Sequence, residues 1–146
     1  MSIDAEDPFE LNRFVKAQET NYVQALSELH AGRKRLHWMW YVFPQLAGLG
    51  HSSMSVRYAI KSEGEARAYL DHPILGPRLI ECAEAVVAIS NRTAHDIFGS
   101  PDDLKLQSCA TLFEHVSPPG SVFGRLLDKY YRSDRDQRTL DLLAVV

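Results

Sequence analysis

The chain has 146 residues, of which 45% are hydrophobic and 24% are charged, and its formal net charge at pH 7 is −3. The length fits one domain, and the composition excludes a disordered chain because enough apolar surface is present to offset the loss of chain entropy on folding. The net negative charge excludes a general electrostatic attraction of the whole chain to nucleic acid or to acidic membranes.

The first elements are helical. Asp7 and Pro8 predict a helix start, since aspartate is a favoured N-cap and proline suits the first helical position. Apolar residues then recur at helical spacing in two successive segments, the second capped by Thr20 and ended by Gly32. The pattern leaves open whether these segments are two helices or one bent helix.

The next segment, LHWMWYVFPQLAGLG (36–50), is the most apolar part of the chain. On a helical wheel its large side chains cover both sides, with Leu36, Met39, Trp40 and Phe43 on one face and Trp38, Tyr41 and Val42 on the other. A helix that is apolar all round belongs inside a helical domain, where it is contacted on several sides. We therefore predict a central, largely buried aromatic helix that ends or kinks at Pro44, followed by a loop over QLAGLGHSS.

Five more helices are predicted in the remainder of the chain. Ser62 and Glu65 have the spacing of a capping box for a helix over 63–72, which Pro73 ends. The others are expected over 77–90, 101–116, 121–131 and 136–145, with a turn at SPPG (117–120). Strand signals are scarce, because alternating patterns and Asn-Gly or Asp-Gly hairpin turns are missing. The prediction is an all-α fold: a single compact multihelical domain, residues 1–146, around the aromatic helix.

The two cysteines, Cys82 and Cys109, fall in helical apolar patterns and are expected to be buried free thiols. The N-terminal stretch MSIDAEDPFE lacks the apolar core of a signal peptide. The longest apolar run is shorter than the ~20 residues that a bilayer span needs. We expect a cytoplasmic protein with no membrane association.

Several of these stretches together resemble a known family. DPFELNRFVKAQ, GRKRLHWMWYVFPQLAGLG, HPILGPRL and DDLKLQSCATLF, spread over nearly the whole chain, are similar to the domain-of-unknown-function eighteen-ten family, a bacterial family also labelled calpastatin. The resemblance implies a multihelical domain with a buried central helix and no established activity. We reject the calpastatin label, since true calpastatin repeats are disordered and this chain has the composition of a packed domain.

Two positions depart from the family pattern. Cys109 and Ala110 stand where family members often have serine and methionine, which weakens a catalytic role for position 109. Ser133 stands where a glycine is common, a difference that concerns a turn rather than chemistry.

Two single residues are weak catalytic candidates. Lys105 falls inside the apolar arc of the 101–116 helix, and its ammonium either reaches solvent past the stripe or pairs with a carboxylate or a ligand anion. His37 stands alone in the aromatic run, as a hydrogen-bonded core residue or as a general acid or base. The histidines are scattered and no Cys-x-x-Cys occurs, so no metal site and no cofactor are predicted.

The remaining candidates are binding residues. Arg33, Lys34 and Arg35 border the aromatic rings, either as cations for a phosphorylated ligand or as a solvated helix end. The segment GLGHSS, with Gly48 and Gly50, is either an anion nest or a simple turn, and Arg57 follows it closely.

The leading hypothesis is a domain that binds a small anionic ligand, such as a nucleotide or sugar phosphate, with enzymatic activity left open. Arg33, Arg35 and Lys105 would hold the anion, Trp38 or Trp40 would stack on the ligand, Gly48, Gly50 and Arg57 would complete the site, and His37 would handle a proton. This hypothesis requires that Lys105, His37 and the arginines share one cavity. The alternative is a non-catalytic protein-interaction module; nucleic-acid binding is disfavoured by the net charge.

Overall fold

The computed structural model describes residues 7–144 and contains, within that range, nine helices and no strand. The helices are α1 (Asn12–His30), α2 (Met39–Val42), α3 (Ser53–Arg57), α4 (Glu63–Asp71), α5 (Leu75–Ala88), α6 (Ala94–Phe98), α7 (Asp102–His115), α8 (Val122–Tyr130) and α9 (Gln137–Ala144). A single parallel bridge joins Leu46 and Ile60. The all-α prediction is confirmed.

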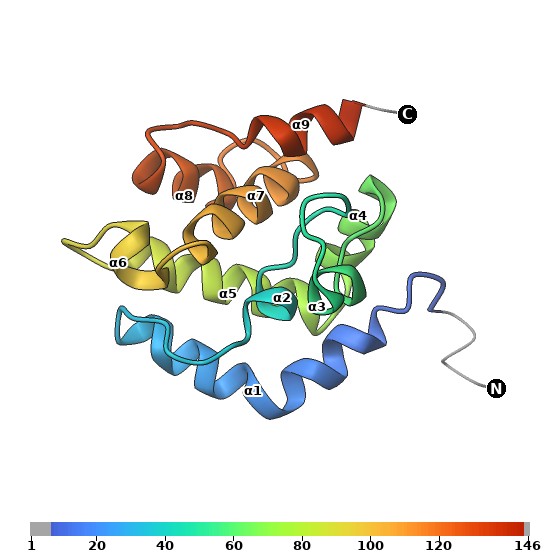
Figure 1. The fold of residues 1–146 in the computed structure, drawn as a ribbon, viewed down its shortest axis with the longest axis horizontal. Coiled ribbons are helices and arrows are strands. Elements are labelled where there is room, and N and C mark those ends of the chain that lie inside the picture. The colour runs from blue at the N-terminus through green and yellow to red at the C-terminus, as the bar shows by residue number, and fades with distance from the viewer. Residues whose placement is uncertain (1–6, 145–146) are drawn as a thin grey trace.

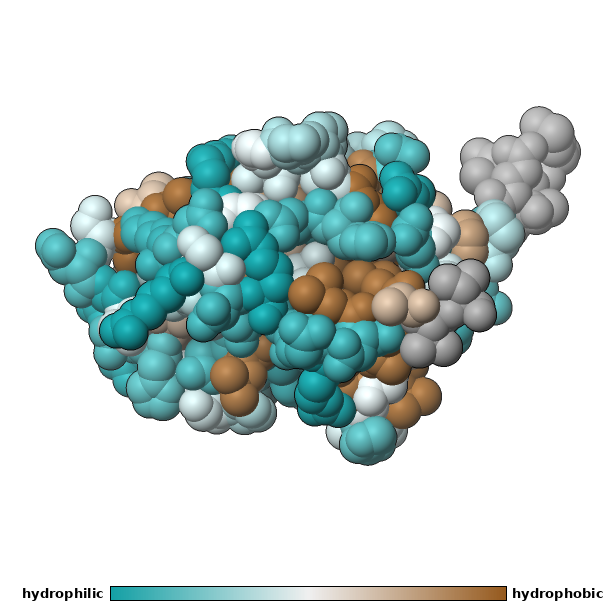
Figure 2. Space-filling model, turned by 90° about the horizontal axis from the view of Figure 1, so that it is seen from above, coloured by the Kyte–Doolittle hydropathy of each residue, from teal (hydrophilic) through white to brown (hydrophobic). Residues whose placement is uncertain are grey.

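The helices pack in layers, with α1 on one side, α5 in the middle, and α7, α8 and α9 on the other side (Figure 1). α5 contacts α1, α4 and α8, and α7 contacts α6, α8 and α9. Buried apolar side chains from α1, α2, α4, α5, α7 and α8 form one continuous core. The face that carries α8 and α9 is mostly hydrophilic, with one large hydrophobic patch and several smaller ones (Figure 2).

α1 is one continuous helix, which settles the question that the sequence pattern left open. It begins at Asn12 rather than at Pro8 as predicted, because Glu10 has φ 54°, outside the right-handed helical region. Asp7 still acts as a cap: its carboxylate accepts hydrogen bonds from the backbone N–H groups of Leu11 (2.8 Å) and Asn12 (3.0 Å).

Arg13 of α1 ties the start of the described chain to the α3–α4 region. All five guanidinium N–H groups have acceptors, which are the backbone oxygens of Phe9, Glu10, Arg57 and Ala59 and the carboxylate of Glu65. The ion pair to Glu65 measures 2.7 Å, and the Glu65 side chain is 1% exposed. This pair is therefore a buried anchor between distant segments.

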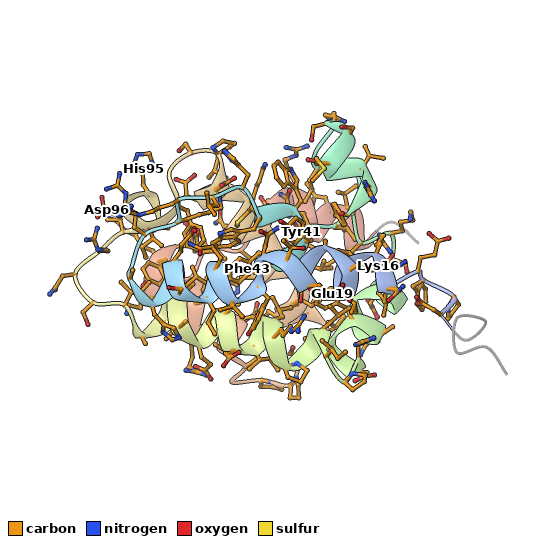
Figure 3. All side chains as sticks on the ribbon, turned by 90° about the horizontal axis from the view of Figure 1, so that it is seen from below. Lys16, Glu19, Tyr41, Phe43, His95 and Asp96 are labelled. Carbon is orange, nitrogen blue, oxygen red and sulfur yellow. The ribbon has the colours of Figure 1, made fainter. Side chains whose placement is uncertain are left out.

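The aromatic run is buried as predicted, but only a short part of it is helical. α2 spans four residues, and the chain leaves the helix at Phe43, before Pro44. Trp38, Tyr41 and Phe43 are at most 5% exposed, whereas Leu36 is 48% exposed. Figure 3 labels Tyr41 and Phe43 from this run beside α1. The helix ends before Pro44, as predicted. It starts only at Met39, because the backbone N–H groups of Arg35 and Leu36 donate to the Glu28 carboxylate instead of continuing a helix.

Two short helices were missing from the sequence analysis. α3 begins in the last residue of the predicted loop, and the hydroxyl of Ser52 caps it by accepting from the backbone N–H of Ser55. α6 begins after a reciprocal capping box between Thr93 and Asp96.

α4 and α5 meet at a close backbone approach. Ser62 caps α4 as predicted, by accepting from the N–H of Glu65 at 3.0 Å. α5 starts at Leu75, two residues before the predicted Pro77. A Cβ on Gly76 would lie 2.0 Å from the carbonyl oxygen of Leu70, so only glycine fits between the two helices.

The C-terminal helices lie where they were predicted, although residue 145 of the last predicted helix, like residues 1–6 of the N-terminal stretch, lies outside the described residues. Ser133 has φ 66° and therefore occupies a left-handed position that glycine favours. Cys82 and Cys109 are buried and free, as expected.

Candidate functional site

A buried carboxylate shapes the segment that leads into the aromatic run. Glu28 of α1 is 4% exposed. Its carboxylate accepts hydrogen bonds from the backbone N–H groups of Arg35 (2.7 Å) and Leu36 (3.1 Å), from Trp38 Nε1 (2.9 Å) and from Gln24 Nε2 (3.0 Å). Burial alone would raise the pKa of Glu28, but these donors together lower it to about 2. Glu28 therefore stays ionised and fixes the course of residues 33–38.

Lys34 and Lys105 share one carboxylate, that of Asp102 at the start of α7. Lys34 Nζ lies 2.8 Å from Asp102 Oδ2, and Lys105 Nζ lies 3.7 Å from Asp102 Oδ1. The Lys34 side chain is 7% exposed, and that of Lys105 is 24% exposed. One negative charge thus faces two positive charges, which leaves Lys105 the more weakly paired of the two lysines.

Each of these lysines also lies near a tryptophan ring. Lys34 Nζ is 5.2 Å from the ring centroid of Trp38, and Lys105 Nζ is 5.6 Å from that of Trp40. These distances are within the range of cation–π attraction. Trp38 is buried, whereas Trp40 is partly exposed.

A groove of about 400 Å³ opens at Lys105, and it is lined by residues of α7, of the loop before α3 and of the start of α9. Its lining combines apolar and polar residues: Gln45, Leu49, Gly50, Pro101, Leu104, Lys105, Gln107, Ser108, Asp136 and Arg138. A smaller cavity, which shares Gln45 and Lys105 with the groove, is lined by Met39, Trp40, Phe43, Ser55 and Tyr58. We call the two together the Lys105 groove. Its larger part has a volume in the usual range for a small-ligand site, whereas the smaller cavity, at about 10 Å³, has room for about one water molecule.

The Lys105 groove contains some of the predicted site residues and not others. Lys105, Trp40 and Gly50 line it. A Cβ on Gly50 would lie 2.6 Å from Ser55, so the loop closes on α3 only with glycine there. These three residues come from separate parts of the sequence and are brought together by the fold.

The other predicted residues lie elsewhere. Arg33, Arg35 and His37 are exposed and do not line the Lys105 groove, so the convergence that the hypothesis required is not seen. Trp38 is buried against Glu28. Gly48, with φ 101°, packs near Leu142 outside the lining, and Arg57 lines a separate depression that also includes Lys16 and Arg13.

The groove also includes residues that the sequence analysis did not select. Asp136 is hydrogen-bonded through Oδ2 to Ser108 Oγ at 3.0 Å, across 28 positions of sequence. Gln45, Gln107 and Arg138 complete the polar lining. Of these, only Asp136 carried a sequence signal, as the first residue of the last predicted helix.

The buried thiols carry no chemistry at this site. Burial raises the pKa of Cys82 to about 12 and raises the pKa of Cys109 well above its ordinary value. The thiolate is the reactive form of cysteine. Both residues therefore act as apolar core residues.

A second cluster joins His95, Ser100 and Asp103 at the outer end of α6, where Figure 3 labels His95. Ser100 Oγ lies 3.3 Å from His95 Nδ1, and Asp103 Oδ2 lies 3.6 Å from the same nitrogen. In a Ser-His-Asp catalytic triad the serine and the carboxylate are hydrogen-bonded to different ring nitrogens of the histidine. The shared nitrogen and the 68% exposure of the His95 side chain identify a surface hydrogen-bond cluster instead.

The described residues contain neither a cluster of metal ligands nor a membrane-spanning helix. Between residues 7 and 144, no three His, Cys, Asp or Glu side chains are grouped so that they would hold a metal ion. No helix in the same part of the chain combines the length and hydrophobicity that a membrane span requires.

Comparison with known proteins gives one family and one solved structure. Residues 8–143 match the model of the family described as "Protein of unknown function (DUF1810)". The crystal structure of the conserved hypothetical protein Rv1873 from Mycobacterium tuberculosis is 54% identical, with a TM-score of 0.94, and the alignment covers 96% of this chain and 100% of that one. No curated protein matches the chain significantly.

Proposed function

Because the chain belongs to the family described as "Protein of unknown function (DUF1810)", a description that names no activity, we propose a function from the Lys105 groove itself. The proposed function is the binding of a small anionic ligand of the nucleotide or sugar-phosphate class by Lys105 and Arg138. The site of the sequence hypothesis is abandoned, because Arg33, Arg35 and His37 lie outside the groove.

The observation that carries this proposal is the charge arrangement around Asp102. Lys34 holds one oxygen of this carboxylate at 2.8 Å, and Lys105 contacts the other only at 3.7 Å. A ligand anion in the groove would therefore gain a close contact to an ammonium that Asp102 neutralises only in part. Arg138 adds a second positive charge to the lining, which has one negative charge, that of Asp136.

The walls of the groove suit a ligand with an anionic group and an organic body. Leu49, Pro101 and Leu104 provide apolar surface, and Leu104 is 60% exposed. Trp40 presents a partly exposed ring beside the Lys105 ammonium. A planar ring of a ligand would stack on such a surface.

We assign binding rather than catalysis because the one hydroxyl–carboxylate pair in the lining has a structural role. Ser108 donates to Asp136 Oδ2, but the same oxygen also accepts hydrogen bonds from the backbone N–H and the hydroxyl of Thr139. Asp136 thereby caps the start of α9 and is a poor general base for Ser108.

The test is a thermal-shift titration of the purified protein with nucleotides, sugar phosphates and inorganic phosphate. A ligand that binds only the folded state adds stability, about 2.7 kcal/mol at a concentration 100 times its Kd. Lys105→Ala is expected to lose most of the shift. Lys61→Ala, which removes an exposed lysine outside the groove, is the matched control and should keep it. The absence of any shift across the panel, or equal shifts in Lys105→Ala and wild type, would refute the proposal.

The second candidate function is a protein-interaction module, and one observation favours it. A groove of about 390 Å³ between α4, α5 and α8 has an apolar lining that includes Leu70, Ile80, Val116, Val122 and Phe123, with Arg67, Asp71, Glu84 and Arg125 around it. Ile80 is 42% exposed. Such a lining suits an amphipathic helix of a partner protein. In that case Ile80→Asp would abolish binding to one defined partner, while Lys105→Ala would leave it intact.

A further inference from the structure

We propose that the Lys105 groove binds a phosphorylated sugar in one orientation, with the phosphate at Lys105 and the sugar hydroxyls at Asp136. This inference rests on the proposed function and adds the chemical class and direction of the ligand. It is carried by the way in which Asp136 is held.

Every polar group of Asp136 except Oδ1 has a hydrogen-bond partner among the described residues. Its backbone N–H donates to Thr111 Oγ1 at 2.9 Å. Its Oδ2 accepts from Ser108 Oγ at 3.0 Å and from the backbone N–H of Thr139 at 3.2 Å. The backbone oxygen accepts from the N–H of Leu140 at 3.2 Å. Among residues 7–144, no group donates to Oδ1, so this oxygen is available to a ligand in the groove that Asp136 lines.

A carboxylate oxygen of this kind selects hydroxyl groups and repels phosphate. An ionised carboxylate accepts hydrogen bonds and donates none, and a sugar hydroxyl is a good donor. Recognition of ribose hydroxyls by an acidic side chain is a common device in nucleotide-binding sites. The negative charge of Asp136 repels a phosphate at short range, and Arg138, which also lines the groove, offsets part of this repulsion.

Lys105 brings the complementary charge to the same groove. It precedes Ser108 by three residues on α7, which corresponds to a rise of about 4.5 Å along the helix. Ser108 in turn is hydrogen-bonded to Asp136, which lies just before α9. The ammonium and the carboxylate therefore border one groove from two different elements.

Neutral polar and apolar groups between the two charges fit a sugar ring. Gln45 and Gln107 line the groove with amide groups that donate and accept. Gln107 Nε2 donates to the backbone oxygen of Asp134, which leaves its amide oxygen without a donor among the described residues. Leu49 and Leu104 would pack against the C–H face of the ring.

The experiment measures Kd by isothermal titration calorimetry for ribose 5-phosphate, ribose and inorganic phosphate. Wild type is expected to bind ribose 5-phosphate at least about tenfold more tightly than inorganic phosphate, the gain from one or two added hydrogen bonds. Lys105→Ala should weaken both phosphate ligands. Asp136→Asn should bind inorganic phosphate at least as tightly as wild type, because a repelling negative charge is removed, and should lose the preference for the sugar phosphate.

Asp136→Asn is a close test because asparagine is as good an N-cap as aspartate, and its amide oxygen can replace Oδ2 toward Ser108 and Thr139. The amide NH₂ would then stand where Oδ1 accepts. If this variant fails to fold, the absence of a preference for ribose 5-phosphate over inorganic phosphate in wild type would still overturn the inference.

The outcomes separate the two proposals. Binding of inorganic phosphate that depends on Lys105, with no preference for ribose 5-phosphate, would overturn this inference and leave the proposed function standing. An unchanged preference in Asp136→Asn would also overturn it. Failure of every phosphate ligand to bind would overturn both.

Discussion

The carboxylate of Glu28 gives the most quantitative prediction. It is buried at the end of α1 and accepts two backbone and two side-chain hydrogen bonds, and these donors lower its pKa from the ordinary 4.5 to about 2. Glu28→Gln keeps the size of the side chain and removes its charge. The amide can still accept from some of these donors, but more weakly.

The magnitude follows from the pKa difference between the folded and unfolded chain. Because the folded pKa is the lower one, the ionised form stabilises the fold above pH 4.5, and this contribution is lost as the pH falls toward 2. A difference of about 2.5 units corresponds to about 3 kcal/mol of unfolding free energy at pH 7. Between pH 7 and pH 3, wild type is expected to lose about 2 kcal/mol from this residue alone.

The assay is urea unfolding of wild type and Glu28→Gln, followed by circular dichroism at several pH values from 3 to 7. Other carboxylates titrate in both proteins, so the difference between the two unfolding free energies isolates Glu28. This difference should narrow by about 2 kcal/mol as the pH is lowered. Glu19→Gln, an exposed change on the same helix, should give a small difference at every pH. Parallel curves for wild type and Glu28→Gln would refute the reasoning.

Three further predictions concern stability, each measured as the change in unfolding free energy. Gly76→Ala places a Cβ 2.0 Å from the Leu70 carbonyl oxygen, so α4 and α5 must separate, and we expect a loss of at least about 3 kcal/mol; a loss below 1 kcal/mol would contradict the close approach. Ser133→Gly relieves a φ of 66° and should raise stability by about 0.5 kcal/mol, whereas a clear decrease would show that the lost serine hydrogen bond outweighs the relief. Arg13→Lys cannot reproduce the five-donor fork beside the buried Glu65 and should cost about 2 kcal/mol; a variant as stable as wild type would mean that the fork contributes little.

Local patterns in the sequence predicted most of the helices. Helical periodicity and caps such as Ser62 depend on residues that are close in sequence, and the structure has these elements within a few residues of their predicted bounds. The aromatic run was harder, because its apolar residues predict burial but not a backbone path. Glu28, a residue of α1, decides that path by holding the segment before Trp38.

The Lys105 groove shows the same limit. The apolar neighbours of Lys105 left open whether its ammonium reaches solvent or pairs with a carboxylate, and in the structure Asp102, three residues away on α7, is a partner at 3.7 Å. The second lysine on that carboxylate, Lys34, arrives from a distant part of the sequence, as does Asp136 beside Ser108. Such pairs are created by packing, so a single sequence gives no periodicity or spacing from which to predict them.

The unequal environments of the two tryptophans have a practical consequence. Trp38 is buried in the core and hydrogen-bonded to Glu28. Trp40 borders the Lys105 groove and is partly exposed. Because these are the two tryptophans of the chain, a ligand in the groove is expected to change the fluorescence of Trp40 and to leave that of Trp38 constant. Tryptophan fluorescence can therefore be used to follow ligand binding in the groove without an added label.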